Sequence, residues 1–255
     1  MSEYKRVRYN KSPLVEVIFQ LRFPTILSIN AKQPAEFQEK IREQYPFYQE
    51  VIEQQNELVI APDGAPSQFK RNEIKNYVFI SSDNKYKINL TSSFISLSTV
   101  AYTQWEDFLN RVKQIIPLFE EIYAPSFYTR VGLRYIDVIT KSNLGLIDKK
   151  WSELIRPHVL GILGTEIEDG ARSYLSESEY ANSDGKTFTK VHFELVHVND
   201  SPETSFLIDT DYFISETVSK EDIITLSELL HFNSSNFIGS SITPVLSAAM
   251  EPVDL

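Results

Sequence analysis

The sequence predicts an α+β protein in which antiparallel strands carry helices packed on one side. Three observations lead to this prediction. Short segments of alternating apolar and polar residues are joined by compact turns, as in a meander. Amphipathic helical segments follow the meanders, and the order of elements in the first half recurs in the second. We expect two sheet-and-helix repeats, over residues 1–140 and 141–255, whose strands form two sheets or one continuous, curved, saddle-like sheet. A single integrated domain is the alternative.

The segment from Ser12 to Pro24 is the clearest strand, because apolar and polar residues alternate along it and a proline lies near each end. The face expected to be buried carries Val15, Val17, Phe19, Leu21 and Phe23. The other face carries Glu16, Gln20 and Arg22, together with Leu14 and Ile18. This pattern is typical of a strand that packs one face on a core and leaves the other partly polar.

The rest of the first half alternates helices with strands. A helix is expected over residues 33–44, where apolar residues recur every four positions. Meander strands follow at residues 77–81, 86–90 and 94–100. The next helix begins at Thr103, which has the capping-box spacing to Glu106, and Pro125 ends it. A second long strand, residues 128–140, places Arg130 and Arg134 on its polar face.

The second half repeats this order without an opening strand of its own. We expect a helix over residues 151–159 and strands at 172–180, 188–198 and 206–214. Ser219 is expected to cap a further helix, with Asp222 as its capping-box partner. Thr243 and Pro244 open a short final helix that ends near Met250. The two halves share too little sequence identity to establish a duplication.

Composition restricts the classes of function. The chain has 255 residues and a net charge of −10, which divides into +1 for residues 1–139 and −11 for residues 140–255. The acidic second half would repel a phosphate backbone, so nucleic-acid binding is expected only on the first half. The chain has no cysteine, which excludes disulfides, thiolate catalysis and cysteine-based metal sites. With no signal-peptide or membrane-span pattern, we expect a cytoplasmic protein.

Four segments spread over nearly the whole chain carry a resemblance. They are Tyr9-Asn10-x-x-Pro13-Leu14-x-Glu16-Val17-x-Phe19-x-x-Arg22-Phe23, Tyr102-x-x-Trp105-x-x-Phe108, Arg130-x-Gly132-Leu133-Arg134-Tyr135 and Ser241-Ile242-Thr243. In this order they resemble the signatures of a sporadically distributed family of uncharacterised prokaryotic proteins of about this length. The resemblance implies no particular chemistry, since no activity is established for the family. Its patchy distribution implies an association with mobile-element or defence systems.

The first candidate site is the polar face of the two long strands. It would place Glu16 and Arg22 beside Arg130 and Arg134, if the strands are neighbours. Guanidinium groups bind carboxylates and phosphates through paired hydrogen bonds, so this surface is a candidate anion site. The alternative is that Glu16 pairs with an arginine and only stabilises the sheet.

The second candidate site is acidic and lies on the strands of the second half. His192, Glu194, Asp209 and Asp211 are expected on outward faces, near Glu177 and Glu179. Such a cluster would hold Mg²⁺ or Mn²⁺ and support phosphoryl chemistry. The alternative is a solvated sheet face with alternating charges.

The N-terminal run of basic residues is a third candidate. Lys5, Arg6, Arg8 and Lys11, with interleaved tyrosines, would contact nucleic acid, or would form a solvated arm or first strand. His158, His197 and His231 are scattered, and no serine lies in a nucleophile-elbow motif.

The function expected from these observations is non-enzymatic binding, without a cofactor. A protein partner or a second copy of the chain would engage a sheet face or the helices. The alternatives are a metal-dependent enzyme acting on a phosphate-containing substrate, and a nucleic-acid-binding protein that uses the N-terminal half.

Overall fold

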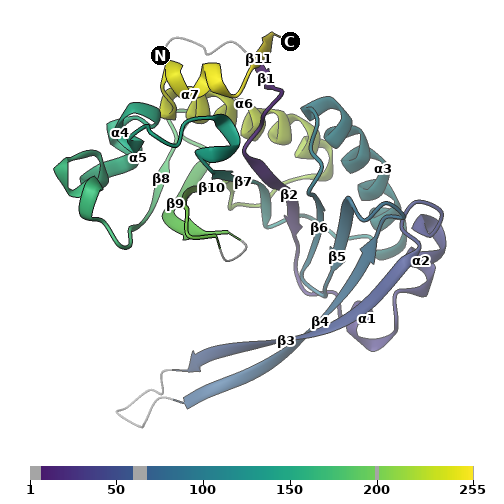
Figure 1. The fold of residues 1–255 in the computed structure, drawn as a ribbon. Helices are drawn as coiled ribbons and strands as arrows, with labels where there is room; N and C mark the ends of the chain where they lie inside the picture. Colours follow the sequence, from purple (N-terminus) through teal and green to yellow (C-terminus); the bar gives the residue numbers. More distant parts are fainter. Residues whose placement is uncertain (1–6, 60–67, 199–200, 255) are drawn as a thin grey trace.

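One continuous antiparallel sheet is the central feature of the computed structural model, which describes residues 7–59, 68–198 and 201–254. Within these residues the sheet has nine strands in the order β3-β4-β5-β6-β2-β7-β10-β9-β8 (Figure 1). The strands are β2 (Leu14–Arg22), β3 (Phe47–Val59), β4 (Gln68–Ile80), β5 (Tyr86–Leu90), β6 (Phe94–Thr99), β7 (Arg130–Ile139), β8 (Leu175–Ala181), β9 (Phe188–His197) and β10 (Thr204–Ile214). The predicted α+β class is confirmed. Of the two arrangements left open, the strands adopt the single sheet.

The two predicted halves of the chain meet where β7, the last strand of residues 1–140, pairs with β10. On its other side β7 pairs with β2, and β2 in turn pairs with β6. Because β7 joins strands of both halves, the sheet runs without interruption across residue 140. The predicted sheet-and-helix repeat, and with it a duplication, stays a prediction.

A β-bulge near the start of β2 changes which side chains face the core. The register against β7 shifts between Leu14 and Glu16, so Leu14 lies opposite Asp137 and Glu16 lies opposite Ile136. The extra residue, Val15, is 44% exposed. The alternation predicted from Val17 to Phe23 is correct, but Val15 is not in the core and Leu14 packs against it. One inserted residue reverses the face of every residue before it.

Two long helices, α3 (Trp105–Tyr123) and α6 (Ile223–Ser241), lie along the same face of the sheet (Figure 1). The buried stripe of α3 is the predicted one, namely Trp105, Phe108, Leu109, Val112, Ile115, Ile116 and Phe119. The predicted capping box is wrong, because the N-cap is Gln104 and the Thr103 hydroxyl donates instead to Asp107 at 3.0 Å. In the described parts of the chain, none of the helices combines the length and hydrophobicity that a membrane span needs.

The strands β3 and β4 form a long hairpin that projects from the body of the sheet (Figure 1). Each strand is 13 residues long, whereas alternation predicted only residues 77–81 in this part of β4. On β3, Val51 and Ile52 are neighbours on opposite faces and both are exposed. Around Val51 and Ile52 the hairpin therefore gains little from burial, and the backbone ladder carries the pairing there.

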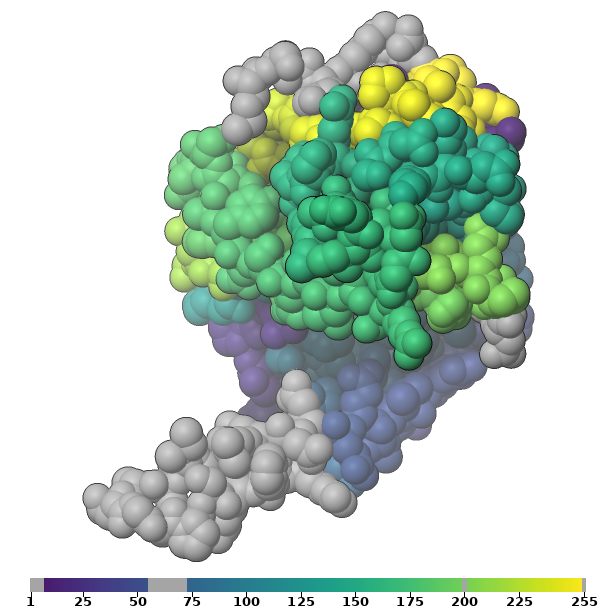
Figure 2. Space-filling view, turned by 60° about the vertical axis from the view of Figure 1, so that its left-hand side comes forward, coloured from purple at the N-terminus to yellow at the C-terminus, as the bar shows by residue number. Residues whose placement is uncertain are grey.

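Shorter elements surround the ends of the sheet. They are α1 (Leu27–Ala31), α2 (Ala35–Ile41), α4 (Trp151–Leu154), α5 (Pro157–Leu160), α7 (Pro244–Ala249) and a ribbon of β1 (Val7–Tyr9) with β11 (Pro252–Asp254). The predicted cap of α7 is confirmed, since the Thr243 hydroxyl accepts from the Leu246 amide. Figure 2 shows the C-terminal segment, in yellow, lying against the teal and green elements of the second half. Two hydrophobic cores result, a large one under α3 and a smaller one under α4, α5 and α7.

Candidate functional site

The arginines predicted to bind an anion lie on the face of the sheet that α3 and α6 leave uncovered, which we call the open face. Two of them, Arg130 and Arg134, are each paired with an aspartate of β10. Nη2 of Arg130 donates to both carboxylate oxygens of Asp211, at 2.8 and 2.6 Å. Arg134 makes two parallel hydrogen bonds to Asp209, and Nε donates at 2.7 Å. Two arginines of the predicted anion site thus form ion pairs with two aspartates of the predicted metal site.

Arg130 is held by more than its aspartate. Its Nη1 donates to Oε1 of Gln20 at 3.2 Å, and its guanidinium lies 4.7 Å from the ring centroid of Phe213. To reach these partners, the side chain passes over Gly132. The result is a half-buried ion pair between neighbouring strands.

Glu16 and Arg22 complete the predicted anion site but do not form an ion pair with its other members. The Glu16 carboxylate lies 3.9 Å from Nζ of Lys87 on β5, and Nε of Arg22 donates to Gln20 at 3.0 Å. Partial burial and the nearby Arg130 charge lower the pKa of Arg22. The open face therefore brings the four predicted residues onto one surface with most of their charge already compensated.

The predicted metal ligands are not gathered into a metal site. In the described residues, no group of three or more histidine, aspartate or glutamate side chains is placed to hold an ion. His192 approaches Glu194 at 3.0 Å and Glu177 at 3.9 Å, while Glu177 also pairs with Lys190. The carboxylates of Asp209 and Asp211 form ion pairs with Arg134 and Arg130.

The basic N-terminal run falls partly outside the described residues, since these begin at Val7 and leave out Lys5 and Arg6. Arg8 lies on β1, and Lys11 forms a 2.7 Å ion pair with Glu251 beside β11. The described part of the run is therefore a short strand and its turn.

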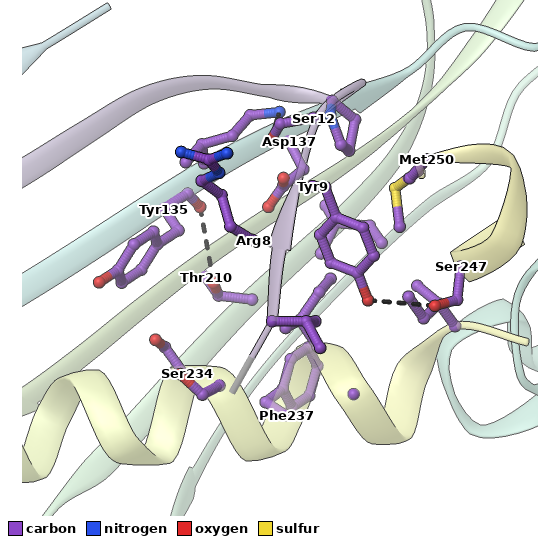
Figure 3. Close-up of a pocket in the computed structure, with 18 of the residues that line it drawn as sticks. Arg8, Tyr9, Ser12, Tyr135, Asp137, Thr210, Ser234, Phe237, Ser247 and Met250 are labelled. Carbon is purple, nitrogen blue, oxygen red and sulfur yellow. Dashed lines mark hydrogen bonds between the residues drawn. The ribbon is translucent and has the colours of Figure 1, made fainter. Parts of the chain in front are cut away.

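A cavity of about 690 Å³ lies on the helix-covered side of the central strands. The inward face of β7 and β10 forms its floor, α6 forms a wall, and β1 crosses over it (Figure 3). Tyr9 fastens β1 to α7, because its hydroxyl lies 3.3 Å from the Ser247 hydroxyl. The polar lining includes Tyr9, Ser12, Asp137, Thr210, Ser234 and Ser247 (Figure 3). Parts of all four segments that carry the resemblance also line this cavity.

The cavity lies at the seam between the two hydrophobic cores. On β7, Tyr135 belongs to the large core and Ile139 to the small one, and Asp137 lies between them. On β10, Thr210 is at the matching position between Tyr212 and Ile208. Polar residues interrupt the apolar inward face on both strands, and the gap between the cores opens above them.

Asp137 is the unusual residue of this lining. It is half-buried on the inward face of β7, with Leu14 and Ile208 opposite it on the neighbouring strands. Burial, with a smaller contribution from the Asp209 charge, raises the pKa of Asp137 to about 7. No hydrogen bond or ion pair to its carboxylate is found among the described residues. A carboxylate in this setting is available to a ligand.

A connected set of side chains forms the end of the cavity near α3. The Tyr135 hydroxyl lies 2.8 Å from Nδ1 of His231, and burial raises the pKa of Tyr135. The His231 ring stacks on Trp105 with centroids 4.4 Å apart, and the Trp105 indole donates to Glu228 at 2.7 Å. These contacts fix the shape of the wall.

Sequence reasoning missed Asp137, although a signal was present. The alternation that puts Val131, Leu133 and Tyr135 inward continues to residue 137, where it places an aspartate. A charged residue at a core position of a regular strand is uncommon and indicates a cavity, an ion pair or a site. The convergence of Tyr9, His231 and Ser247 on the same cavity has no comparable signal, because it depends on tertiary structure.

Comparisons with known proteins add little. No protein-family model matches the sequence, and no curated protein matches it. Among solved structures, one similar chain is described as the crystal structure of the di-domain ARO/CYC StfQ from the steffimycin biosynthetic pathway. It is 9% identical, and the match covers 92% of this chain and 95% of that one with a TM-score of 0.19. At that score the likeness supports neither a fold assignment nor a function.

Proposed function

We propose that this protein is a binding protein whose ligand is a small organic molecule held in the cavity between β7, β10 and α6. The observation that carries the proposal is the cavity itself. Its volume of about 690 Å³ lies within the range of small-molecule sites in proteins. Its lining is mostly apolar, with a few polar groups that converge on the same space.

The composition of the lining favours a ligand with an apolar body. Phe237 and Ile238 of α6 face Ile139 and Ile208 across the cavity, so an apolar group is removed from water on entering. The hydroxyls of Thr210 and Ser234 supply hydrogen-bonding groups that orient the molecule (Figure 3).

Binding of the neutral dye Nile red tests the proposal. We expect its fluorescence to rise and saturate with the wild-type protein. Ser234→Trp fills the space beside α6 and is expected to weaken binding at least tenfold. Ser183→Trp is the matched control, because Ser183 is exposed in the turn between β8 and β9. Equal binding by both variants, when circular dichroism shows that both are folded, would rule out this cavity as the site.

A protein partner or a second copy of the chain is the second candidate, and the edge strand β3 favours it. In the described part of the chain β3 pairs only with β4, which leaves one edge of its ladder open. Phe47 and Val51 on this strand are 50% and 42% exposed. An open edge with apolar side chains can accept a strand from another molecule. Light scattering at low and high salt tests self-association. A monomer under both conditions would rule out a second copy of the chain as the partner.

A cytoplasmic location, with a role beside mobile-element or defence systems, is part of the proposal. The absence of cysteine from the sequence supports the location, because cytosolic proteins do not depend on disulfides. Fractionation of the native host, followed by detection of the protein, checks this; recovery outside the cytosolic fraction contradicts it.

A further inference from the structure

The carboxylate of Asp137 is a half-buried acid with which none of the described residues forms an ion pair. It faces a cavity whose other polar groups include hydroxyls, side-chain amides, an imidazole and the guanidiniums of Arg8 and Arg156. Leu14 and Ile208 flank it on the adjacent strands. An ionised carboxylate in apolar surroundings is costly unless a cation or several donors approach it.

The charged and titratable groups around Asp137 are engaged elsewhere or exposed. Nε of Arg156 donates to the Ile242 carbonyl at 3.3 Å, and His231 is bonded to Tyr135. Arg8 comes from β1 and is exposed, so water screens its charge. Tyr135 and Tyr212 remain neutral, because burial raises the pKa of each. None of these groups forms an ion pair with Asp137.

Aromatic side chains line the same cavity as the carboxylate. Tyr135 lies two residues away on the same face of β7, and Tyr102 packs edge-on to it with ring centroids 6.1 Å apart. Tyr9 of β1 and Phe237 of α6 also line the cavity (Figure 3). Aromatic faces beside a carboxylate are suited to an ammonium group, which gains both an ion pair and cation–π contacts.

We propose that Asp137 binds the ammonium group of an organic amine whose apolar body fills the rest of the cavity. This inference rests on the proposed function and names the chemical class of the ligand. The amine supplies the ion-pair partner that the described lining residues do not give Asp137, and its apolar part lies between the sheet and α6. Neutral or anionic molecules of the same shape leave the carboxylate without a partner.

The pH dependence of amine binding follows from the ionisation of Asp137. The pKa of Asp137 is raised to about 7, while alkylamines stay protonated across the range from pH 6 to pH 8. Only the ionised carboxylate attracts the ammonium group strongly. Binding should therefore be about tenfold tighter at pH 8 than at pH 6, in proportion to the ionised fraction.

Displacement of Nile red by matched probes tests the inference. The amines are tryptamine, 2-phenylethylamine and octylamine, and their neutral isosteres are 3-propylindole, propylbenzene and nonane. We expect at least one amine to displace the dye at least tenfold better than its isostere at pH 8. In Asp137→Asn this preference and its pH dependence should both disappear. Asp148→Asn, which removes the same charge at an exposed position, should leave both unchanged.

The outcomes separate the inference from the function on which it rests. If the wild-type protein binds Nile red but no amine outcompetes its isostere, the amine inference is overturned and the small-molecule site remains. If the amine preference persists in Asp137→Asn, the inference is overturned as well. If Nile red does not bind the wild-type protein, the proposed function fails first.

Discussion

Arg130 reaches Asp211 by lying across Gly132, so a side chain at residue 132 would force the guanidinium to move. A Cβ atom there would lie 2.1 Å from Nη1 of Arg130 and 2.7 Å from Cζ. The two partners are only 17% and 28% exposed, which makes the pair stronger than an ordinary surface ion pair. The spacing Arg130-x-Gly132 thus has a physical explanation in this fold.

Gly132→Ala is expected to destabilise the protein by about 1–3 kcal/mol, the range for losing charged hydrogen bonds in a partly buried site. The methyl group displaces the guanidinium and leaves Asp211 without its partner. Urea denaturation measures the difference. Gly170→Ala is the control, because nothing lies within 4 Å of its Cβ position and its φ is not positive. Equal urea midpoints for the two variants would show that Arg130 still pairs with Asp211 in another side-chain conformation.

Mn²⁺ is expected not to bind the aspartates of β10. Arg134 and Arg130 occupy the oxygens that a metal would use, and displacing them costs two charged hydrogen-bonded pairs. Isothermal titration with Mn²⁺ up to the millimolar range should give no saturable heat. One-to-one binding that Asp209→Asn abolishes would contradict the prediction and restore the metal-dependent alternative.

Periodicity predicted the central strands well, because each has one face on a core. The inward residues of β10, including Phe206, Ile208 and Tyr212, are buried as the alternation predicts. The stripe of α3 was equally clear for the same reason. Where a segment buries an apolar face, its sequence shows the period of its structure.

Features that depend on pairing between distant segments were not predictable in this way. The hairpin of β3 and β4 projects from the body, so the run from Gln49 to Asn56 shows no regular alternation. The bulge at Val15 looks like one more step of a regular strand. The pairing of Arg134 with Asp209 joins residues 75 positions apart in the chain. Only the register of β7 against β10 brings them together.

Asp184→Ala is expected to lower stability by about 1 kcal/mol at pH 7, and by less at pH 3. Its carboxylate accepts hydrogen bonds from the Lys186 amide and from Thr187, and one from Asn233 of α6 at 3.0 Å. Partial burial opposes ionisation, but these hydrogen bonds lower the pKa of Asp184 to about 2. A folded-state pKa below the unfolded value contributes stability that is lost as pH falls toward 2. The group is exposed, so solvent screening keeps the effect small.

Thermal denaturation of Asp184→Ala between pH 3 and pH 7 measures the change, with Asp148→Ala as a control at an exposed position. If the loss of thermal stability relative to wild type is the same at pH 3 and pH 7, the charge of Asp184 does not contribute to stability, and the turn stabilises the protein through its shape alone.

Asp137→Asn is expected to have the opposite pH dependence in the unliganded protein. The pKa of Asp137 is about 7 in the folded protein and near 4 when unfolded, so folding opposes ionisation of this group. The wild-type protein therefore loses stability as pH rises from about 4 through about 7, and the loss is complete above that range. The asparagine variant, which does not ionise, should match wild type near pH 4. At pH 8 it should be more stable, by on the order of 2–4 kcal/mol. Urea denaturation at pH 4, 6 and 8 checks this, with Asp148→Asn as the control. If the two curves stay parallel, the carboxylate has a partner when the cavity is empty, and a ligand amine would have to displace that partner before binding.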